Sequence, residues 1–323
     1  MSTREKEPVL DPKGVAISSQ PSHRKGVDTP DPSHSPNIEE KFARVDGGRM
    51  RYLRAGSGPP LILLHGLLGY SFSWRFTIPV VSKRATVYAV DMLGTGFSER
   101  MPELDCCLRA SAERLLRFLD VIGVSRFDLV ATSHGGAVAM ILASICADQC
   151  AEPRQRRLQR LILADPVNPW SPHGRRLAPF VGSGPGSFLF LHLLARRSST
   201  YGYWLRRLYG NSRRIPPGTL EGYTAPFKIP GTFEYGISVT RHWTEGLYEL
   251  RTMLPKIADY PTLIIWGARD RAVDPRSAEP LQGVFKHAQL VMLPEAGHLP
   301  YEETPEEFNQ AVLNFLQSTS ANF

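Results

Sequence analysis

One serine in this sequence stands where a polypeptide can expose a reactive hydroxyl. Ser133 lies in the stretch LVATSHGGAVA, between apolar runs at 127–131 and 137–143. The first run predicts a short buried strand, and the second predicts a helix with two glycines at its mouth. A strand that turns sharply into a helix exposes the side chain at the turn, so Ser133 is a candidate nucleophile. The alternative role is a helix N-cap, which serine also favours.

A serine hydroxyl becomes an effective nucleophile when a base takes its proton and an acid holds that base. His298, in EAGH, is the candidate base, and Asp270, in WGARD, is the candidate acid. Two other carboxylates remain alternative acids: Asp165, which follows an apolar run at 158–164, and Asp274, which is close to Asp270 in sequence. A serine, a histidine and a carboxylate that act together perform acyl transfer.

The elements that must position these residues alternate along the chain. Strands are predicted at 61–64, 85–90, 127–132, 158–164, 262–266 and 289–293, after a hairpin of 42–45 and 49–55, and helices at 71–82, 108–122, from 135 onward, 277–285 and 305–316. This order predicts an α/β fold with a mostly parallel central sheet that helices cover on both faces. Ligand sites in such folds lie beyond the carboxyl ends of the strands, where Ser133, Asp270 and His298 stand.

The alternation is absent at the N-terminus and is interrupted once. Residues 1–38 are rich in proline, serine and charge, and this composition predicts a disordered tail. The stretch 166–250, called here the inserted segment, has no predicted strand and holds apolar helical pieces such as 188–194. So long a segment inside a domain is typical of a lid. We therefore predict a helical cap inserted into a core formed by 39–165 and 251–323.

Five short motifs carry a resemblance to a known family. HGLLG, DMLGTGFS, TSHGG, WGARD and EAGH occur in this order at the ends of predicted strands. With these landmarks the sequence resembles α/β-hydrolase fold proteins from about residue 41 to residue 316. The resemblance implies that Ser133 is the nucleophile, His298 the base and Asp270 the acid, and that the N–H groups of Leu67 and His134 form the oxyanion hole.

One position departs from the pattern of that family. The usual first glycine of G-x-S-x-G is Ala131 here, which adds a methyl group where strand and helix nearly touch. Three other polar residues near the motifs are expected to do different work. The side chain of His134 is a candidate for lining the pocket, His65 is expected to make structural hydrogen bonds, and Asp91 is expected to form a turn.

The net charge of +7 is concentrated in the inserted segment, which has ten basic and four acidic residues. Its arginines include the pairs 175–176, 196–197, 206–207 and 213–214. One interpretation is a solvated outer face; another is that the apolar run 188–194 and the arginines that follow it contact an anionic membrane surface or an acyl chain. A nucleic-acid partner is not expected, because no reader fold accompanies the charge.

Cysteine usage and the termini indicate a compartment. Four cysteines without a ligand spacing predict free thiols in a reducing cytoplasm, and the charged N-terminus lacks a secretory signal. No apolar run reaches the length of about 18 residues that spans a bilayer. No histidine pair or phosphate loop indicates a metal or another cofactor, so none is expected.

Three functions remain open on the sequence. The first is a serine hydrolase that cleaves an ester of an apolar acid through an acyl-enzyme, with Phe188, Phe190 and Leu193 as candidate pocket residues. The second is a carbon–carbon bond hydrolase of dienoic ring-cleavage products, and the third is a non-catalytic ligand-binding protein. Family members that resemble haloalkane dehalogenases or epoxide hydrolases use an aspartate at the nucleophile position, where this sequence has Ser133.

Overall fold

An eight-stranded sheet forms the centre of the computed structural model, which describes residues 37–150, 152–172, 177–194 and 198–318. The strands are β1 (Glu39–Val45), β2 (Gly48–Ala55), β3 (Pro60–Leu64), β4 (Thr86–Val90), β5 (Phe127–Thr132), β6 (Leu158–Ala164), β7 (Thr262–Gly267) and β8 (Ala288–Leu293). Their order in the sheet is β1-β2-β4-β3-β5-β6-β7-β8. β1 and β2 pair as an antiparallel hairpin, β2 is antiparallel to β4, and the other pairs are parallel. The predicted fold class is confirmed.

The apolar runs of the central strands are continuous because both faces of the sheet are covered. Along β3, Ile62 and Leu64 belong to one buried cluster, while Leu61 and Leu63 belong to another on the opposite face. Successive side chains of a strand point to opposite faces, so a strand covered on both sides needs an apolar residue at every position. Because of this requirement, the strands could be predicted from the sequence.

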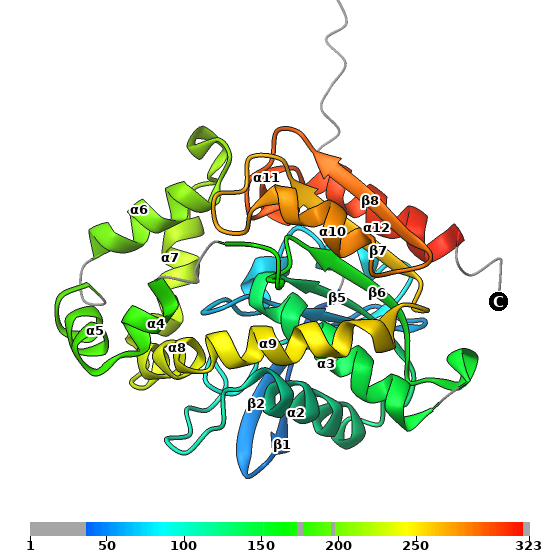
Figure 1. Cartoon of the computed structure of the whole chain (residues 1–323), viewed down its shortest axis with the longest axis horizontal. Coiled ribbons are helices and arrows are strands. Elements are labelled where there is room, and N and C mark those ends of the chain that lie inside the picture. Colours follow the sequence, from blue (N-terminus) through cyan, green and yellow to red (C-terminus); the bar gives the residue numbers. More distant parts are fainter. Residues whose placement is uncertain (1–36, 151, 173–176, 195–197, 319–323) are drawn as a thin grey trace, which may run out of the picture. The chain divides into compact units, whose positions relative to one another are not determined.

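Helices of the core cover the two faces. These helices are α1 (Ile78–Val81), α2 (Leu108–Val121), α3 (Ser133–Gln149), α10 (Ala278–Gln282), α11 (Pro300–Glu303) and α12 (Pro305–Ser318). Residues of α2, α3 and α10 pack in one buried cluster, and residues of α1, α11 and α12 pack in the other. Figure 1 shows α2 and α3 together on one side of the sheet.

The described part of the chain between β6 and β7 consists of helices joined by turns and loops, and contains no strand. It contains α4 (Leu177–Gly182), α5 (Gly184–Leu189), a π-helical stretch (Phe190–Leu194), α6 (Ser198–Leu208), α7 (Thr219–Thr224), α8 (Thr232–Arg241) and α9 (Trp243–Met253). α9 continues past residue 250 and contacts α3, as Figure 1 shows. The inserted segment is therefore attached to the core through α9, which begins in the segment and ends in the core.

Three predicted helix ranges were wrong in detail. The stretch 71–82 forms a 3₁₀ turn (Ser71–Trp74) and then α1, because Pro79 lacks the N–H that would continue one helix and instead sits in the first turn of a new one. The stretch 277–285 is shorter as well: a 3₁₀ turn capped by Asp274 leads into α10. α3 begins at Ser133 itself and not at residue 135.

Some expectations concern residues outside the described ranges. The predicted tail lies almost entirely there, as do the arginine pairs 175–176 and 196–197. No helix within the described ranges has both the length and the apolar character that crossing a bilayer requires.

Candidate active site

Ser133 occupies the sharp turn between β5 and α3. Its backbone φ is 53°, in the left-handed region that residues other than glycine rarely adopt. The chain packs so tightly here that a Cβ atom at Gly135 would lie 2.2 Å from the carbonyl oxygen of His65. Ala131 is completely buried in the strand before the turn, so its extra methyl group fits. The strained turn brings Ser133 to the wall of a cavity.

The three residues singled out from sequence lie in one hydrogen-bonded chain. Nε2 of His298 is 2.9 Å from Oγ of Ser133, and Nδ1 of His298 is 2.7 Å from Oδ2 of Asp270. An ionised carboxylate only accepts hydrogen bonds, so Nδ1 carries the proton and Nε2 is left to accept from the serine hydroxyl. Oδ1 of Asp270 accepts from the N–H groups of Ala272 and Val273, at 2.6 and 3.0 Å. This is the order of groups that acyl transfer needs.

Asp165, the main alternative acid, is completely buried beside this chain. One oxygen of Asp165, one of Asp270 and a ring nitrogen of His298 lie within 4.8 Å of one another. Oδ1 of Asp165 accepts from the N–H of Gly267 at 2.9 Å, whereas Oδ2 is buried with no donor among the described residues. Burial, and then the charge of Asp270, raise the pKa of Asp165 well above its usual value. The structure records no hydrogen bond between Asp165 and the imidazole, so Asp165 lies beside this chain of groups and does not hold the ring.

The same three side chains are the one group within the described ranges whose spacing would suit a metal ion. Both ring nitrogens of His298 and both oxygens of Asp270 are already engaged in hydrogen bonds. These hydrogen bonds already form a chain along which a proton can move. Binding a metal ion there would require some of them to break.

We expect Asp165→Asn to change how stability depends on pH. The folded-state pKa of Asp165 is raised above the unfolded value of about 3.9. The stability that this group provides is therefore full below about pH 4 and is lost as pH rises toward the folded pKa, at about 1.4 kcal/mol per pH unit. Asparagine cannot ionise and retains both a donor for Asp270 and an acceptor for Gly267.

The measurement is urea unfolding of both proteins between about pH 5 and pH 8. The free energy of unfolding of the variant minus that of the wild type should increase with pH, and all unchanged titrating groups cancel in this difference. Parallel pH profiles would show that Asp165 does not take up a proton on folding.

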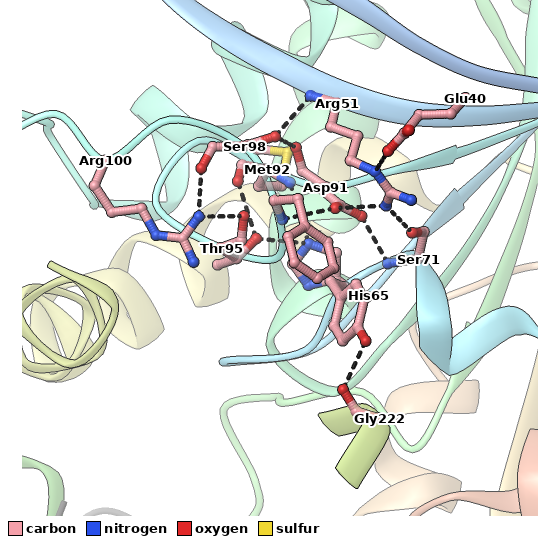
Figure 2. A network of polar contacts seen from close by, with 12 residues as sticks. Glu40, Arg51, His65, Ser71, Asp91, Met92, Thr95, Ser98, Arg100 and Gly222 are labelled. Carbon is pink, nitrogen blue, oxygen red and sulfur yellow. Dashed lines mark hydrogen bonds and ion pairs between the residues drawn. The ribbon is translucent and has the colours of Figure 1, made fainter. Parts of the chain in front are cut away.

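His65 holds the loop that follows β3, as the sequence predicted. Nδ1 donates to the carbonyl of Gly66 at 2.8 Å, while Nε2 accepts from the N–H of Met92 at 3.2 Å and lies 3.1 Å from Oγ1 of Thr95. Burial lowers the pKa of His65, which keeps the ring neutral. Figure 2 shows this imidazole within a polar network that includes Met92 and Thr95.

Asp91 anchors the same network, and its predicted role in a turn is confirmed. Its side chain accepts from the N–H of Ser71 at 2.8 Å, from the N–H of Phe97 at 3.0 Å and from the guanidinium of Arg51 at 3.0 Å. The hydroxyl of Ser98 donates to its carbonyl at 2.6 Å (Figure 2). These bonds fix the loops after β3 and β4 to each other beneath the cavity.

The two predicted oxyanion donors lie beside Ser133. Leu67 lines the cavity, and a Cβ atom on the preceding Gly66 would come within 2.9 Å of Cβ of Ser133. His134 is the second residue of α3, where helical N–H groups have no intrahelical acceptor. Within the described ranges neither N–H donates to another group. Both are therefore free to donate to an oxygen that develops negative charge next to Oγ.

A cavity of about 450 Å³ opens above Ser133 and His298. The core contributes loop residues to its wall, and the inserted segment contributes mostly apolar side chains: Val181, Phe190, Tyr201, Trp204, Leu205 and Phe233. Among the described lining residues there is no lysine or arginine. The site therefore suits a neutral, largely apolar group next to the nucleophile.

The predicted pocket residues have different outcomes. Phe190 lines the cavity, and its ring centre lies 6.0 Å from that of Phe233. The prediction for Phe188 was wrong: this side chain is 65% exposed, and its ring packs on His192 instead. Residues two positions apart point in different directions on a helix, so both could not face one cavity. The side chain of Leu193 lies outside the described part of the chain.

The side chain of His134 turns away from the cavity. Its ring stacks on Trp243 at 6.2 Å and an interplanar angle of 22°, beside a separate hollow of about 10 Å³. Burial, with a smaller contribution from His65, lowers the pKa of His134 to about 4. The ring is thus a neutral packing group, and only its backbone N–H concerns the site.

The sequence analysis missed two residues that support the site, Glu302 and Glu303. In sequence they lie in YEETP, where they are typical of acids near the start of a helix. Glu302 accepts from the guanidinium of Arg75 at 2.7 and 2.9 Å and from the hydroxyl of Tyr223, a cavity residue on α7. Glu303 accepts from three backbone N–H groups, those of Gly210, Asn211 and Gly297. Since Gly297 directly precedes His298, these acids tie the loop of His298 to the inserted segment.

The chain is similar over most of its length to several known proteins. The chain is 28% identical over 301 residues to haloalkane dehalogenase 2 of Mycobacterium tuberculosis, covering 88% of this chain and 97% of that protein. It is 26% identical over 298 residues to a 2-hydroxymuconate semialdehyde hydrolase of a Pseudomonas species, covering 90% and 98%. The crystal structure of a membrane phospholipase A, described as a bacterial virulence factor, matches with a TM-score of 0.70 and 26% identity, covering 87% and 86%.

The family model for the alpha/beta hydrolase fold matches residues 59–305. This range contains the strands β3 to β8, which form the parallel part of the sheet, and the turn that carries Ser133. The chain belongs to the α/β-hydrolase fold family.

Proposed function

We propose that this hydrolase is a serine esterase that cleaves a carboxylic ester of an apolar acid. The observation that carries the proposal is the placement of the Ser133–His298 pair at the wall of a 450 Å³ cavity whose described lining has no basic side chain other than His298. An apolar acyl group fits such a wall, and its carbonyl carbon is presented to the serine oxygen.

The geometry supports a two-step reaction. Oγ of Ser133 attacks the ester carbonyl as Nε2 of His298 takes its proton, and the N–H groups of Leu67 and His134 stabilise the oxyanion. The histidine then returns the proton to the departing alcohol, which leaves an acyl-serine. Water, activated by the same imidazole, hydrolyses the acyl-serine. Asp270 holds the ring throughout and stabilises its charged form.

The nucleophile argues against the reaction named for the dehalogenase relative. Attack of a serine oxygen on a carbon that bears a halide would leave an alkyl ether, which has no carbonyl group for water to attack. An acyl-serine does have one. Ser133 therefore supports turnover of carbonyl substrates and not of alkyl halides.

The second candidate, cleavage of a carbon–carbon bond in a dienoic acid, needs a place for the carboxylate of the substrate. Burying an unpaired carboxylate in an apolar cavity is costly. The described lining offers hydroxyls and one amide, such as Ser73, Tyr223 and Asn168, but no arginine or lysine. This lining favours a neutral ester.

A substrate panel tests the proposal. Purified full-length protein is assayed with chromogenic esters of graded acyl length, with a dienoic ring-cleavage product and with a fluorophosphonate that labels activated serines. We expect ester turnover and labelling of Ser133. Turnover of the dienoate alone would support the second candidate, and labelling without turnover of any ester would support a ligand-binding protein.

Acyl-chain preference is expected to depend on Phe190. Phe190→Ala enlarges the wall of the cavity, so kcat/KM should shift toward longer acyl chains while short esters change least. Each methylene that gains or loses a fitting wall changes kcat/KM by about 1–3 kcal/mol. The measurement is kcat/KM for acetyl, butyryl and octanoyl esters.

Phe188→Ala is the matched control, because it removes the same side chain from a position outside the cavity. Its acyl-length profile should equal that of the wild type. If Phe190→Ala changes every ester by one common factor, the residue supports packing of the inserted segment and does not select the acyl group.

We also propose that the inserted segment acts as a cap over the site. It supplies one side of the cavity, and Thr232 and Gly222 within it accept hydrogen bonds from Arg100 and Tyr70 of the core, at 2.8 and 2.6 Å. A substrate must therefore enter between the segment and the core or between the helices of the segment.

A further inference from the structure

The inserted segment presents large apolar side chains to solvent. We call the following group the outer patch: Phe180 on α4, Phe188 and Leu189 on α5, and Tyr203 and Trp204 on α6. Single exposed apolar residues are common on soluble proteins. Three consecutive helices that each expose such residues are a feature of surfaces that bind other molecules or membranes.

The helices that carry the outer patch also enclose the cavity. Val181 on α4, Phe190 after α5 and Tyr201 on α6 all line it. The rings of Phe190 and Tyr201 both lie 6.0 Å from the ring of Phe233, which holds their two helical segments together. Figure 1 shows α4, α5 and α6 on the side of the described fold away from β7 and β8. Their inner faces thus bound the substrate site, and their outer faces carry the patch.

Trp204 connects the two surfaces. It lines the cavity, and yet 46% of the residue is exposed to solvent. Its ring also contacts the ring of the exposed Tyr203, at 5.7 Å. The α6 part of the outer patch therefore reaches the edge of the cavity, and a molecule bound to Tyr203 and Trp204 lies beside the site.

The part of the chain that carries the patch is basic in sequence. Residues 166–220 contain eight arginines and no aspartate or glutamate. On α6, Arg206 and Arg207 follow the patch residues directly and are exposed, and no acidic partner for them is present among the described residues. Exposed aromatic residues beside unpaired arginines match the interface of an anionic bilayer, where rings enter the headgroup region and guanidinium groups contact phosphates.

We propose that the outer patch binds the surface of an anionic lipid bilayer and that an amphiphilic ester passes from the bilayer into the cavity. This inference rests on the proposed esterase function and specifies its substrate class. A second copy of the chain is a poorer occupant, because two such patches would bring like charges together. An anionic bilayer supplies negative headgroups for the arginines and an apolar interior for the exposed rings.

The test is sedimentation of the full-length protein with vesicles of phosphatidylcholine and with vesicles of phosphatidylcholine mixed with phosphatidylglycerol. We expect binding to the mixed vesicles, and this binding should weaken with added salt. Arg206→Gln combined with Arg207→Gln should lower it by about 30-fold, from about fivefold per arginine. Phe188→Ala combined with Tyr203→Ala should lower it by at least about tenfold, because apolar burial in the interface is lost.

The matched control is Lys83→Gln combined with Arg84→Gln. These two exposed residues precede β4, at the end of the sheet opposite the site, and their removal changes net charge by the same amount. The control should bind like the wild type. If it weakens binding as much as the α6 variant does, net charge and not the patch causes binding, and the inference fails.

Two further measurements separate this inference from the proposed function. All variants are assayed with a soluble short ester and with an ester dispersed in the mixed vesicles. The patch variants should keep the first activity and lose the second. Turnover of the soluble ester without vesicle binding, or a concentration-dependent dimer abolished by the aromatic variant, overturns the membrane proposal and leaves the esterase standing. Absence of ester turnover in the wild type overturns the function itself.

Discussion

Ser133→Ala is expected to lower kcat for the best ester by about 10⁶-fold while the protein stays folded. The substitution removes the oxygen that His298 contacts at 2.9 Å and leaves no nucleophile in its place. The turn should survive, because alanine and serine tolerate the φ of 53° equally poorly and both are held there by the surrounding packing. The measurements are single-turnover and steady-state kinetics together with an unfolding curve.

Ser73→Ala is the control for this result. Ser73 also carries a hydroxyl at the cavity wall, where it lies 3.2 Å from the hydroxyl of Tyr223, but it makes no hydrogen bond to the imidazole. Its loss should change kcat far less. A folded Ser133→Ala protein that hydrolyses esters at the wild-type rate would mean that another group attacks the carbonyl, and the assignment of the site would be wrong.

Asp270→Asn is expected to lower kcat by about 10⁴-fold, because the amide can donate to Nδ1 and hold His298 in the wrong tautomer. Asp165→Asn should cost much less, since this residue makes no hydrogen bond to the imidazole, whereas Asp270 does. Asp274→Asn should also cost little, because its carboxylate caps the turn before α10. The comparison of the three variants identifies the acid.

The comparison needs two controls. Asp270 also accepts from two backbone N–H groups, so an unfolding curve must show that the loop remains folded. The pH dependence of kcat/KM must also be recorded, because this profile reports the essential acid and base of the free enzyme. Equal losses for Asp165→Asn and Asp270→Asn would show that the two carboxyl groups act as one unit.

Local patterns were sufficient to predict the sheet and the turn at Ser133. The buried strands β3, β5, β6 and β7 each contain a continuous apolar run because each is covered on both faces, and every run ends at a glycine or a polar residue. The antiparallel hairpin at the N-terminal edge has the same local origin, in a Gly-Gly turn between alternating stretches. Features that depend on neighbours in sequence were therefore predictable.

The contacts within the site depend on packing between distant segments. Asp165 and Asp270 follow strands that are adjacent in the sheet, so the sequence could not exclude either one as the acid that holds His298. Only the paths of the loops beyond β6 and β7 decide that Asp270 reaches the imidazole while Asp165 lies behind it. The roles of Glu302 and Glu303 were hidden for the same reason, because their partners lie on other elements.

The sequence by itself determined the fold class and the chain order in which a serine, an aspartate and a histidine follow the ends of strands. Strand burial and turn geometry depend on residues that are neighbours in sequence, so local patterns predict them. The tertiary structure alone decided which carboxylate holds His298, that Phe190 and not Phe188 bounds the cavity, and that α4 to α6 expose a basic, aromatic surface beside it. Those outcomes depend on helix rotation and on side-chain contacts across the fold, which no local pattern records.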